Sequence, residues 1–176
     1  SLHLTDVDIG YFNPDMRLVP PLRQGADRDA LRAALADGSI DALVSDHNPV
    51  ADDAKQLPFG EAEPGATGLE LLLSLSLRWA QDSGLPLATA LARITHDPVR
   101  VLGDALGSLA SSAGRVVEGG VADLCLFDPA DEWAVTPERL ASQGKHTPFA
   151  FASTGMALPG RVRATLVAGT VAYEAA

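Results

Sequence analysis

The sequence contains almost no cysteine, no long hydrophobic run and no cluster of basic residues. Its single cysteine, Cys125, excludes an internal disulfide framework and suits a reducing compartment, so we expect a cytoplasmic protein. The longest apolar stretch, residues 69–77, is interrupted by polar side chains and is too short to span a bilayer. Lys and Arg form no run and the net charge is −10, which leaves no general attraction to phosphate groups. We therefore expect neither nucleic acid nor a membrane as a partner.

What the chain does contain is typical of a globular protein with a real core. Of its 176 residues, 47% are hydrophobic and 20% are charged, which excludes wholesale disorder. The chain begins at Ser1, without Met and in the middle of a pattern, so we expect it to be a piece of a longer protein.

Helical patterns dominate the first hundred residues. Leu31 and Leu35 are spaced as on one helix face, with Asp27 as a possible cap and Gly38 as the stop. The apolar run 40–45 predicts a buried strand, and the residues after it predict a long loop. The further expected elements are a loop over 48–66, a helix over 67–83, a helix from Pro86 to Thr95, and a turn or two capped by Asp97 through Leu102.

The pattern changes near residue 107 from helical to mostly β. We expect strands at 115–118 and 122–127, and a hairpin over 161–173 that turns at Ala168–Gly169. A short helix should open at 136–138. We therefore predict two parts, residues 1–107 and residues 108–176.

The segment most informative about chemistry is Asp46–His47, directly after the expected strand 40–45. A carboxylate and an imidazole at the carboxyl end of a strand occupy the place where (β/α)₈ barrels keep their reactive groups. An aspartate there could take a proton from a metal-bound water or ligate the metal. The alternative, that Asp46 caps the loop and His47 bonds the backbone, is equally compatible with this dipeptide alone.

A series of ordered matches along the whole chain resembles the dihydroorotase family. These matches are Pro20–Arg23, Asp27–Leu31, Asp37–Asp41, Ser45–His47, Lys55–Phe59, Gly65–Glu70, Asp97–Gly103, Gly119–Leu124, Thr147–Phe149 and Gly160–Val162. The resemblance implies an α/β fold, namely the C-terminal portion of a (β/α)₈ amidohydrolase barrel plus part of a small β-sandwich domain. Such a barrel alone needs roughly 250 residues. Active members interconvert carbamoyl aspartate and dihydroorotate, usually on one or two zinc ions.

Carried over residue by residue, the resemblance implies four site residues. Asp46 matches the general base, which lies beside the metal and would ligate it only if metal is bound. Arg23, His47 and Gly68 match positions that we assign to substrate binding. No cofactor is expected on this piece itself.

Three departures from the pattern of active members put catalysis in doubt. Active members read Asp-His-Ala-Pro-His, and Val50 stands at the last histidine, which helps to hold substrate. Val19 replaces an asparagine that bonds the substrate ring. The metal-ligating His-His pair falls on Ser1 and upstream of it, while His3 stands where the family has leucine. Valine can neither coordinate a metal nor form a hydrogen bond.

These departures resemble the inactive dihydroorotase homologues that accompany aspartate transcarbamoylase as structural partners. We therefore expect a non-catalytic structural homologue that supports aspartate transcarbamoylase. We also expect the chain to form a homo- or hetero-oligomer. One alternative is an active zinc hydrolase of the dihydroorotase or allantoinase type, with Asp46 as its base. A third possibility is a small-molecule binding module with a pocket at Asp46 and no metal.

Overall fold

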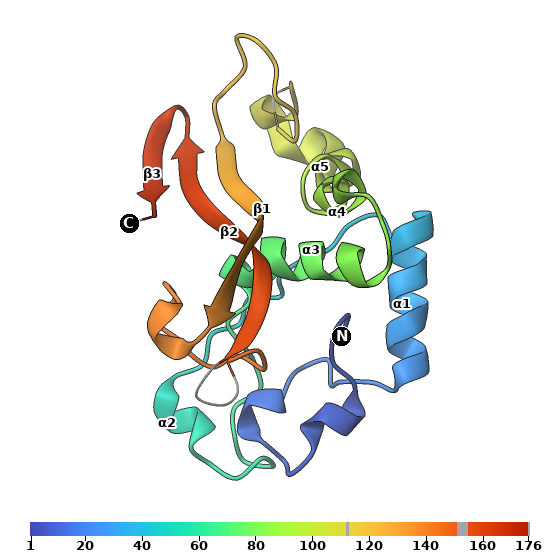
Figure 1. Cartoon of the computed structure of the whole chain (residues 1–176), viewed down its shortest axis with the longest axis vertical. Coiled ribbons are helices and arrows are strands. Elements are labelled where there is room, and N and C mark those ends of the chain that lie inside the picture. Colours follow the sequence, from blue (N-terminus) through green and yellow to red (C-terminus); the bar gives the residue numbers. More distant parts are fainter. Residues whose placement is uncertain (112, 151–154, 176) are drawn as a thin grey trace.

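The computed structural model describes residues 1–111, 113–150 and 155–175. Helices occupy the first two thirds of the chain and a small antiparallel sheet follows (Figure 1). The helical elements are η1 (Asp6–Ile9), η2 (Pro14–Met16), α1 (Gly25–Asp37), α2 (Asp52–Lys55), η3 (Leu69–Leu71), α3 (Leu72–Asp82), α4 (Leu87–Ile94), α5 (His96–Leu102), η4 (Gly103–Ser111) and η5 (Pro137–Arg139). The strands are β1 (Leu124–Val135), β2 (Met156–Val167) and β3 (Thr170–Glu174).

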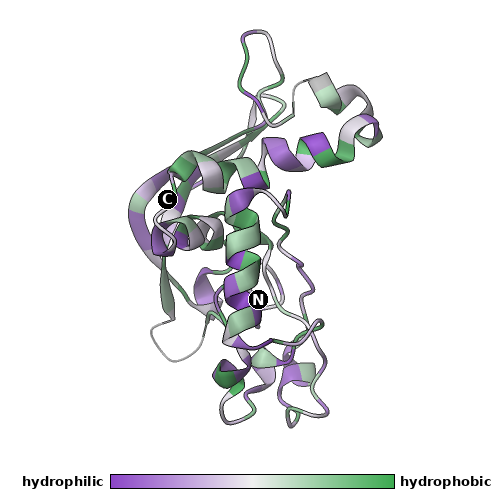
Figure 2. Cartoon of the chain, turned by 90° about the vertical axis from the view of Figure 1, so that its right-hand side faces the viewer, coloured by the Kyte–Doolittle hydropathy of each residue, from purple (hydrophilic) through white to green (hydrophobic). Residues whose placement is uncertain are grey.

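Helix α1 is amphipathic and packs one side against the body of the molecule. Figure 2 views it from its outer side, where hydrophilic and hydrophobic residues are mixed. Its inward residue Leu35 is buried in a cluster with Leu2 and Trp79. Gly38 ends the helix with a φ of 87°, a left-handed conformation that glycine adopts without a steric penalty. The predicted stop at Gly38 is therefore confirmed.

Helix α3 lies at the centre of the fold, between the sheet and helix α1 (Figure 1). The preceding Leu71 is fully buried in a cluster with Val135, Leu140 and Leu158, which come from the β-rich part. The indole nitrogen of Trp133 on β1 donates a hydrogen bond of 3.0 Å to Ser74 Oγ on α3. Because β-rich and helical parts share this core, helix α3 is fixed on both sides.

The three strands form one antiparallel sheet in the order β1-β2-β3. Leu124 pairs with Leu166, and Leu166 in turn pairs with Val171. The β2–β3 turn falls on Ala168 and Gly169, which both have positive φ angles, as a tight two-residue hairpin turn of the right twist requires. The predicted hairpin is thus confirmed, with its first strand beginning earlier than expected, at Met156.

Several local predictions are wrong. Within the described residues, segments 40–45 and 115–118 are not strands, because neither has a neighbouring strand to pair with. Helix α5 begins at His96 with Thr95 as its N-cap, so Asp97 lies inside the helix instead of capping it. The expected loop 48–66 contains the short helix α2.

At the level of the whole chain, helices packed against a small antiparallel sheet agree with the predicted α/β class. The division at residue 107 stays a prediction. In the part of the chain that the structure describes, no helix has the length and apolarity needed to cross a membrane.

Candidate functional site

A cavity of about 240 Å³ lies beside the segment that carries Asp46. Its wall is mostly apolar and is assembled from segments far apart in the sequence: 1–4, 18–20, Leu22, 43–46, Asn48, 65–68, Leu72 and Leu75 of α3, and 147–149. Asp46 is the one acidic side chain in this lining, and the lining contains no Lys or Arg. The site therefore offers an apolar enclosure with a single carboxylate.

The backbone turns sharply at Asp46, which lines the cavity. Its φ of 47° lies in the left-handed region, which aspartate adopts more readily than most side chains. Ser1 lines the same cavity as Asp46.

His47 points its ring at the next loop instead of the cavity. Its Nδ1 accepts hydrogen bonds from the backbone N–H groups of Gly68 and Leu69, at 3.1 Å and 3.3 Å. Nδ1 must therefore be unprotonated, and His47 holds the start of η3 in place. His47 is absent from the cavity lining, so a substrate-binding role for it stays a prediction.

Gly68 lines the cavity and lies tightly against the segment before Asp46. A Cβ at this position would approach Ser45 O to 2.6 Å, closer than real Cβ atoms come. The glycine thus permits close approach of two backbone segments at the site, which places the loop 65–68 beside Asp46. Its predicted contact with substrate stays a prediction.

Arg23 lies outside the cavity. Its guanidinium is 3.5 Å from the Asp27 carboxylate at the start of α1, and 69% of its side chain is exposed. It is not among the cavity-lining residues. The predicted role of Arg23 in substrate binding therefore has no support from its position, and it stays a prediction.

The two valines that depart from the family pattern occupy different surroundings. Val19 lines the cavity and is 70% exposed. Val50 is buried, and its side chain lies beneath Gly65 rather than in the cavity lining. Val19, which matches an asparagine of active members, is therefore an apolar part of the cavity wall. Val50, which matches a histidine, is packed behind the wall.

His3 lines the cavity, although the sequence assigns it no role in the site. Burial and, to a lesser extent, the nearby Arg32 guanidinium lower the pKa of His3 to about 4, so the ring is neutral at pH 7. Its Nε2 is buried without a hydrogen-bond partner, and its ring packs edge-on against Phe149. The only available signal was a histidine at a position where the resembling family has leucine.

The cavity wall 147–149 is held by a loop that returns from the β-rich part. Glu70 accepts hydrogen bonds from Ala141 N at 2.8 Å and Ser142 N at 3.0 Å. Thr67 N donates to His146 O at 2.8 Å. The His146 ring lies between Asp15 at 2.8 Å and Asp52 at 3.3 Å. These contacts fix the returning loop against η2, α2 and the start of η3.

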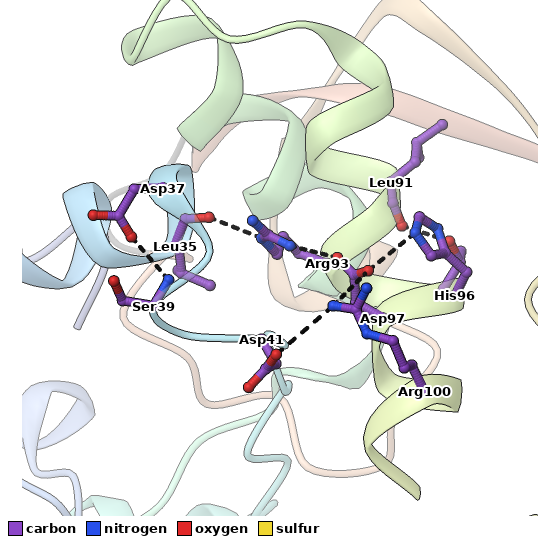
Figure 3. A network of polar contacts seen from close by, with 10 residues as sticks. Leu35, Asp37, Ser39, Asp41, Leu91, Arg93, His96, Asp97 and Arg100 are labelled. Atoms are coloured by element: carbon purple, nitrogen blue, oxygen red, sulfur yellow. Dashed lines mark hydrogen bonds and ion pairs between the residues drawn. The ribbon is translucent and has the colours of Figure 1, made fainter. Parts of the chain in front are cut away.

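An ionic network around the buried Asp97 connects α4 and α5 to the end of α1 and to Asp41 (Figure 3). The Asp97 carboxylate, 2% exposed, pairs with Arg93 of α4 and contacts His96 Nε2 at 3.0 Å. Arg93 also donates to Leu35 O at the end of α1, at 2.8 Å. Its own carbonyl accepts from Leu43 N at 2.9 Å, three residues before Asp46.

A zinc site of the kind that active dihydroorotases use would need several ligands around Asp46. Among residues 1–111, 113–150 and 155–175, no group of three or more His, Cys, Asp or Glu side chains is placed to hold a metal ion. Asp46 and His3 are the candidate ligands in the cavity lining. The described residues therefore bring together no zinc site by themselves.

Comparison with known proteins identifies the family. The Amidohydrolase family model matches residues 7–173. A dihydroorotase-like protein from Pseudomonas aeruginosa is 43% identical over 174 residues, covering 99% of this chain and 38% of the relative. A dihydroorotase from Citrifermentans bemidjiense is 37% identical over 172 residues, with coverages of 98% and 38%. The chain thus spans 38% of the length of these relatives.

Solved structures agree with this assignment. L-Hydantoinase (dihydropyrimidinase) from Arthrobacter aurescens superposes with a TM-score of 0.84 at 28% identity, covering 98% of this chain and 37% of that one. Dihydropyrimidinase from Brevibacillus agri, at 21% identity and a TM-score of 0.81, shows the same fold. The chain therefore belongs to the amidohydrolase family, as a relative of the dihydroorotases.

Proposed function

We propose that this chain is part of a dihydroorotase-like protein that has lost catalysis and serves as a structural partner of aspartate transcarbamoylase in the cytoplasm. The observation that carries the proposal is the chemistry of the cavity wall. Val19 stands in the lining where active members carry an asparagine, and Val50 is buried where they carry a histidine. Neither side chain can hold a polar substrate.

The remaining polar groups add to this view. Asp46 stands at the cavity, but Arg23 is turned to Asp27 and the Nδ1 of His47 is occupied by backbone N–H groups. A carboxylate-bearing substrate would bring a negative charge to a lining that has one carboxylate and no Lys or Arg. The dihydroorotase-like name of the Pseudomonas relative is consistent with the proposal.

The competing proposal is an active zinc-dependent dihydroorotase or allantoinase-type enzyme. It is favoured by the placement of Asp46 in the cavity lining and by relatives named dihydroorotase at 37% identity. In that case the rest of the protein would have to supply the metal ligands. A metal-free small-molecule binding module is the third candidate, and it would be recognised by a thermal shift with dihydroorotate or related acids.

Two measurements on the complete purified protein separate these candidates. Elemental analysis should find less than one zinc ion per chain. Size-exclusion chromatography with light scattering, after mixing with aspartate transcarbamoylase from the same organism, should find a stable complex. Stoichiometric zinc, or two proteins that elute separately, would contradict the structural-partner proposal.

A further inference from the structure

An aromatic tip projects from the end of the molecule that carries η1, η2 and α2 (Figure 1). We define the aromatic tip as residues 6–12. Within it Val7 is 81% exposed, Phe12 67%, and the Tyr11 side chain is entirely exposed. Large apolar and aromatic side chains exposed together commonly mark a protein–protein contact site.

The aromatic tip is held in one conformation by its own hydrogen bonds. Asp8 Oδ2 accepts from Thr5 N at 2.6 Å, and Ile9 O accepts from Phe12 N at 3.0 Å. Asn13 then caps η2 through its side chain, which accepts from Asp15 N. A binding surface that is already ordered loses less conformational entropy on association.

The neighbouring segment 51–63 anchors the aromatic tip from outside. The Phe12 and Phe59 rings meet edge to face at 5.7 Å. The buried Lys55 donates to Pro14 O at 3.0 Å and to Arg17 O at 3.2 Å. Burial lowers the pKa of this ammonium group, and the Asp15 carboxylate raises it in part. The backbone on both sides of Tyr11 is therefore anchored, while the Tyr11 side chain is exposed.

The charged side chains around the aromatic tip are mostly acidic. Residues 5–17 and 51–63 carry seven acidic and two basic side chains. Both basic ones are engaged, since Lys55 is buried and Arg17 donates to Phe59 O and lies over the Phe59 ring. The acidic side chains that remain exposed form the acidic rim: Asp6, Asp8, Asp52, Asp53, Glu61 and Glu63.

We propose that the aromatic tip and its acidic rim form a docking surface for a basic patch on a partner protein, with Tyr11 inserted into an apolar pocket of that patch. The proposal rests on the proposed function and assigns this surface to the contact with aspartate transcarbamoylase. A second copy of this chain is disfavoured as the occupant, because it would bring another acidic rim and a net charge of −10.

The test is a titration of the complete protein with purified aspartate transcarbamoylase from the same organism, followed by calorimetry. Tyr11→Ser should weaken binding about 30-fold, the fold-change of a hot-spot residue. Tyr173→Ser is the matched control, because Tyr173 is also an exposed tyrosine, at 51%, but lies on β3, far from η1 in Figure 1. It should change the affinity less than about 2-fold.

The charge contribution is tested separately with Asp6→Asn combined with Glu61→Gln. This variant should slow association and reduce its dependence on salt, because exposed charges act mainly on the encounter rate. Wild-type protein that fails to bind would overturn both proposals. Wild-type binding with no effect of Tyr11→Ser would overturn the docking surface and leave the proposed function standing. A lowered melting temperature of Tyr11→Ser would also overturn the surface, because it would place Tyr11 in the core of the complete protein.

Discussion

Among the residues that line the cavity, His3 is a largely buried histidine whose pKa is well below its ordinary value. A neutral imidazole with an unpartnered Nε2 in an apolar wall disfavours its own protonated form. His3 therefore ties the stability of the cavity to pH, whatever the cavity holds.

Acidification should destabilise the protein through His3. The folded pKa is about 4 and the ordinary value is 6.5, so between these values the unfolded chain binds a proton that the folded chain does not. Stability should therefore fall as pH drops from 6.5 to 4, by about 3 kcal/mol at most. Urea unfolding of wild type and His3→Leu at several pH values measures this effect as the difference between the two proteins. Parallel pH profiles for both would contradict a buried neutral His3.

Glycine at position 68 is needed for close packing beside Asp46. Gly68→Ala should cost about 1–3 kcal/mol of unfolding free energy, because its Cβ would collide with the Ser45 carbonyl oxygen. Gly25→Ala is the matched control, since nothing lies within 4 Å of its added Cβ, and it should be neutral or stabilising by up to about 1 kcal/mol. Denaturant titration compares them, and equal effects would be incompatible with the tight contact.

At the scale of elements, the ionic network of Asp97 joins α1, α4, α5 and the segment before Asp46 (Figure 3). The exposed members of this network contribute little, because water screens them. The buried Arg93–Asp97 pair is different, since removing one partner leaves a charge without compensation.

Asp97→Asn should therefore destabilise the fold by about 3 kcal/mol or more. Asp41→Asn removes an exposed carboxylate 3.7 Å from Arg100 in the same network and should cost less than about 1 kcal/mol. Thermal unfolding of the two variants measures the contrast. Similar melting temperatures would show that the Arg93–Asp97 pair contributes nothing beyond a surface ion pair.

Elements with local signals were predictable from the sequence, and elements that depend on distant partners were not. Gly38 at the end of α1 and the Ala168–Gly169 turn are set by their own backbone conformations, so their residue types predict them. Segment 40–45 has the composition of a strand, but a strand also needs a hydrogen-bonded neighbour. Here its backbone N–H groups bond carbonyls of helices instead, from Ile40 to Ala34 and from Leu43 to Arg93.

The candidate site shows the same division. Asp46 and Gly68 were found through their motifs, and both line the cavity. His3 and Thr147 join the same wall through packing between residues about 140 positions apart, which no local pattern encodes. The sequence likewise does not determine whether Arg23 points into the cavity or pairs with Asp27, and in the structure it pairs with Asp27.

At the scale of the whole molecule, a chain that spans 38% of its relatives' length forms one wall of a cavity and a three-stranded sheet. The residues that line the cavity are apolar except for Asp46, Ser45 and a few other polar groups. Most charged residues of the chain lie outside this lining. The proposed loss of catalysis and the proposed docking surface both follow from this distribution of polar groups.

The most direct test of lost catalysis is turnover of carbamoyl aspartate to dihydroorotate by the complete purified protein, with zinc added in excess. We predict a rate indistinguishable from that of buffer with zinc, and no further change in Asp46→Asn. Turnover by the wild-type protein that disappears in Asp46→Asn would contradict the prediction and identify an active dihydroorotase with Asp46 as its base.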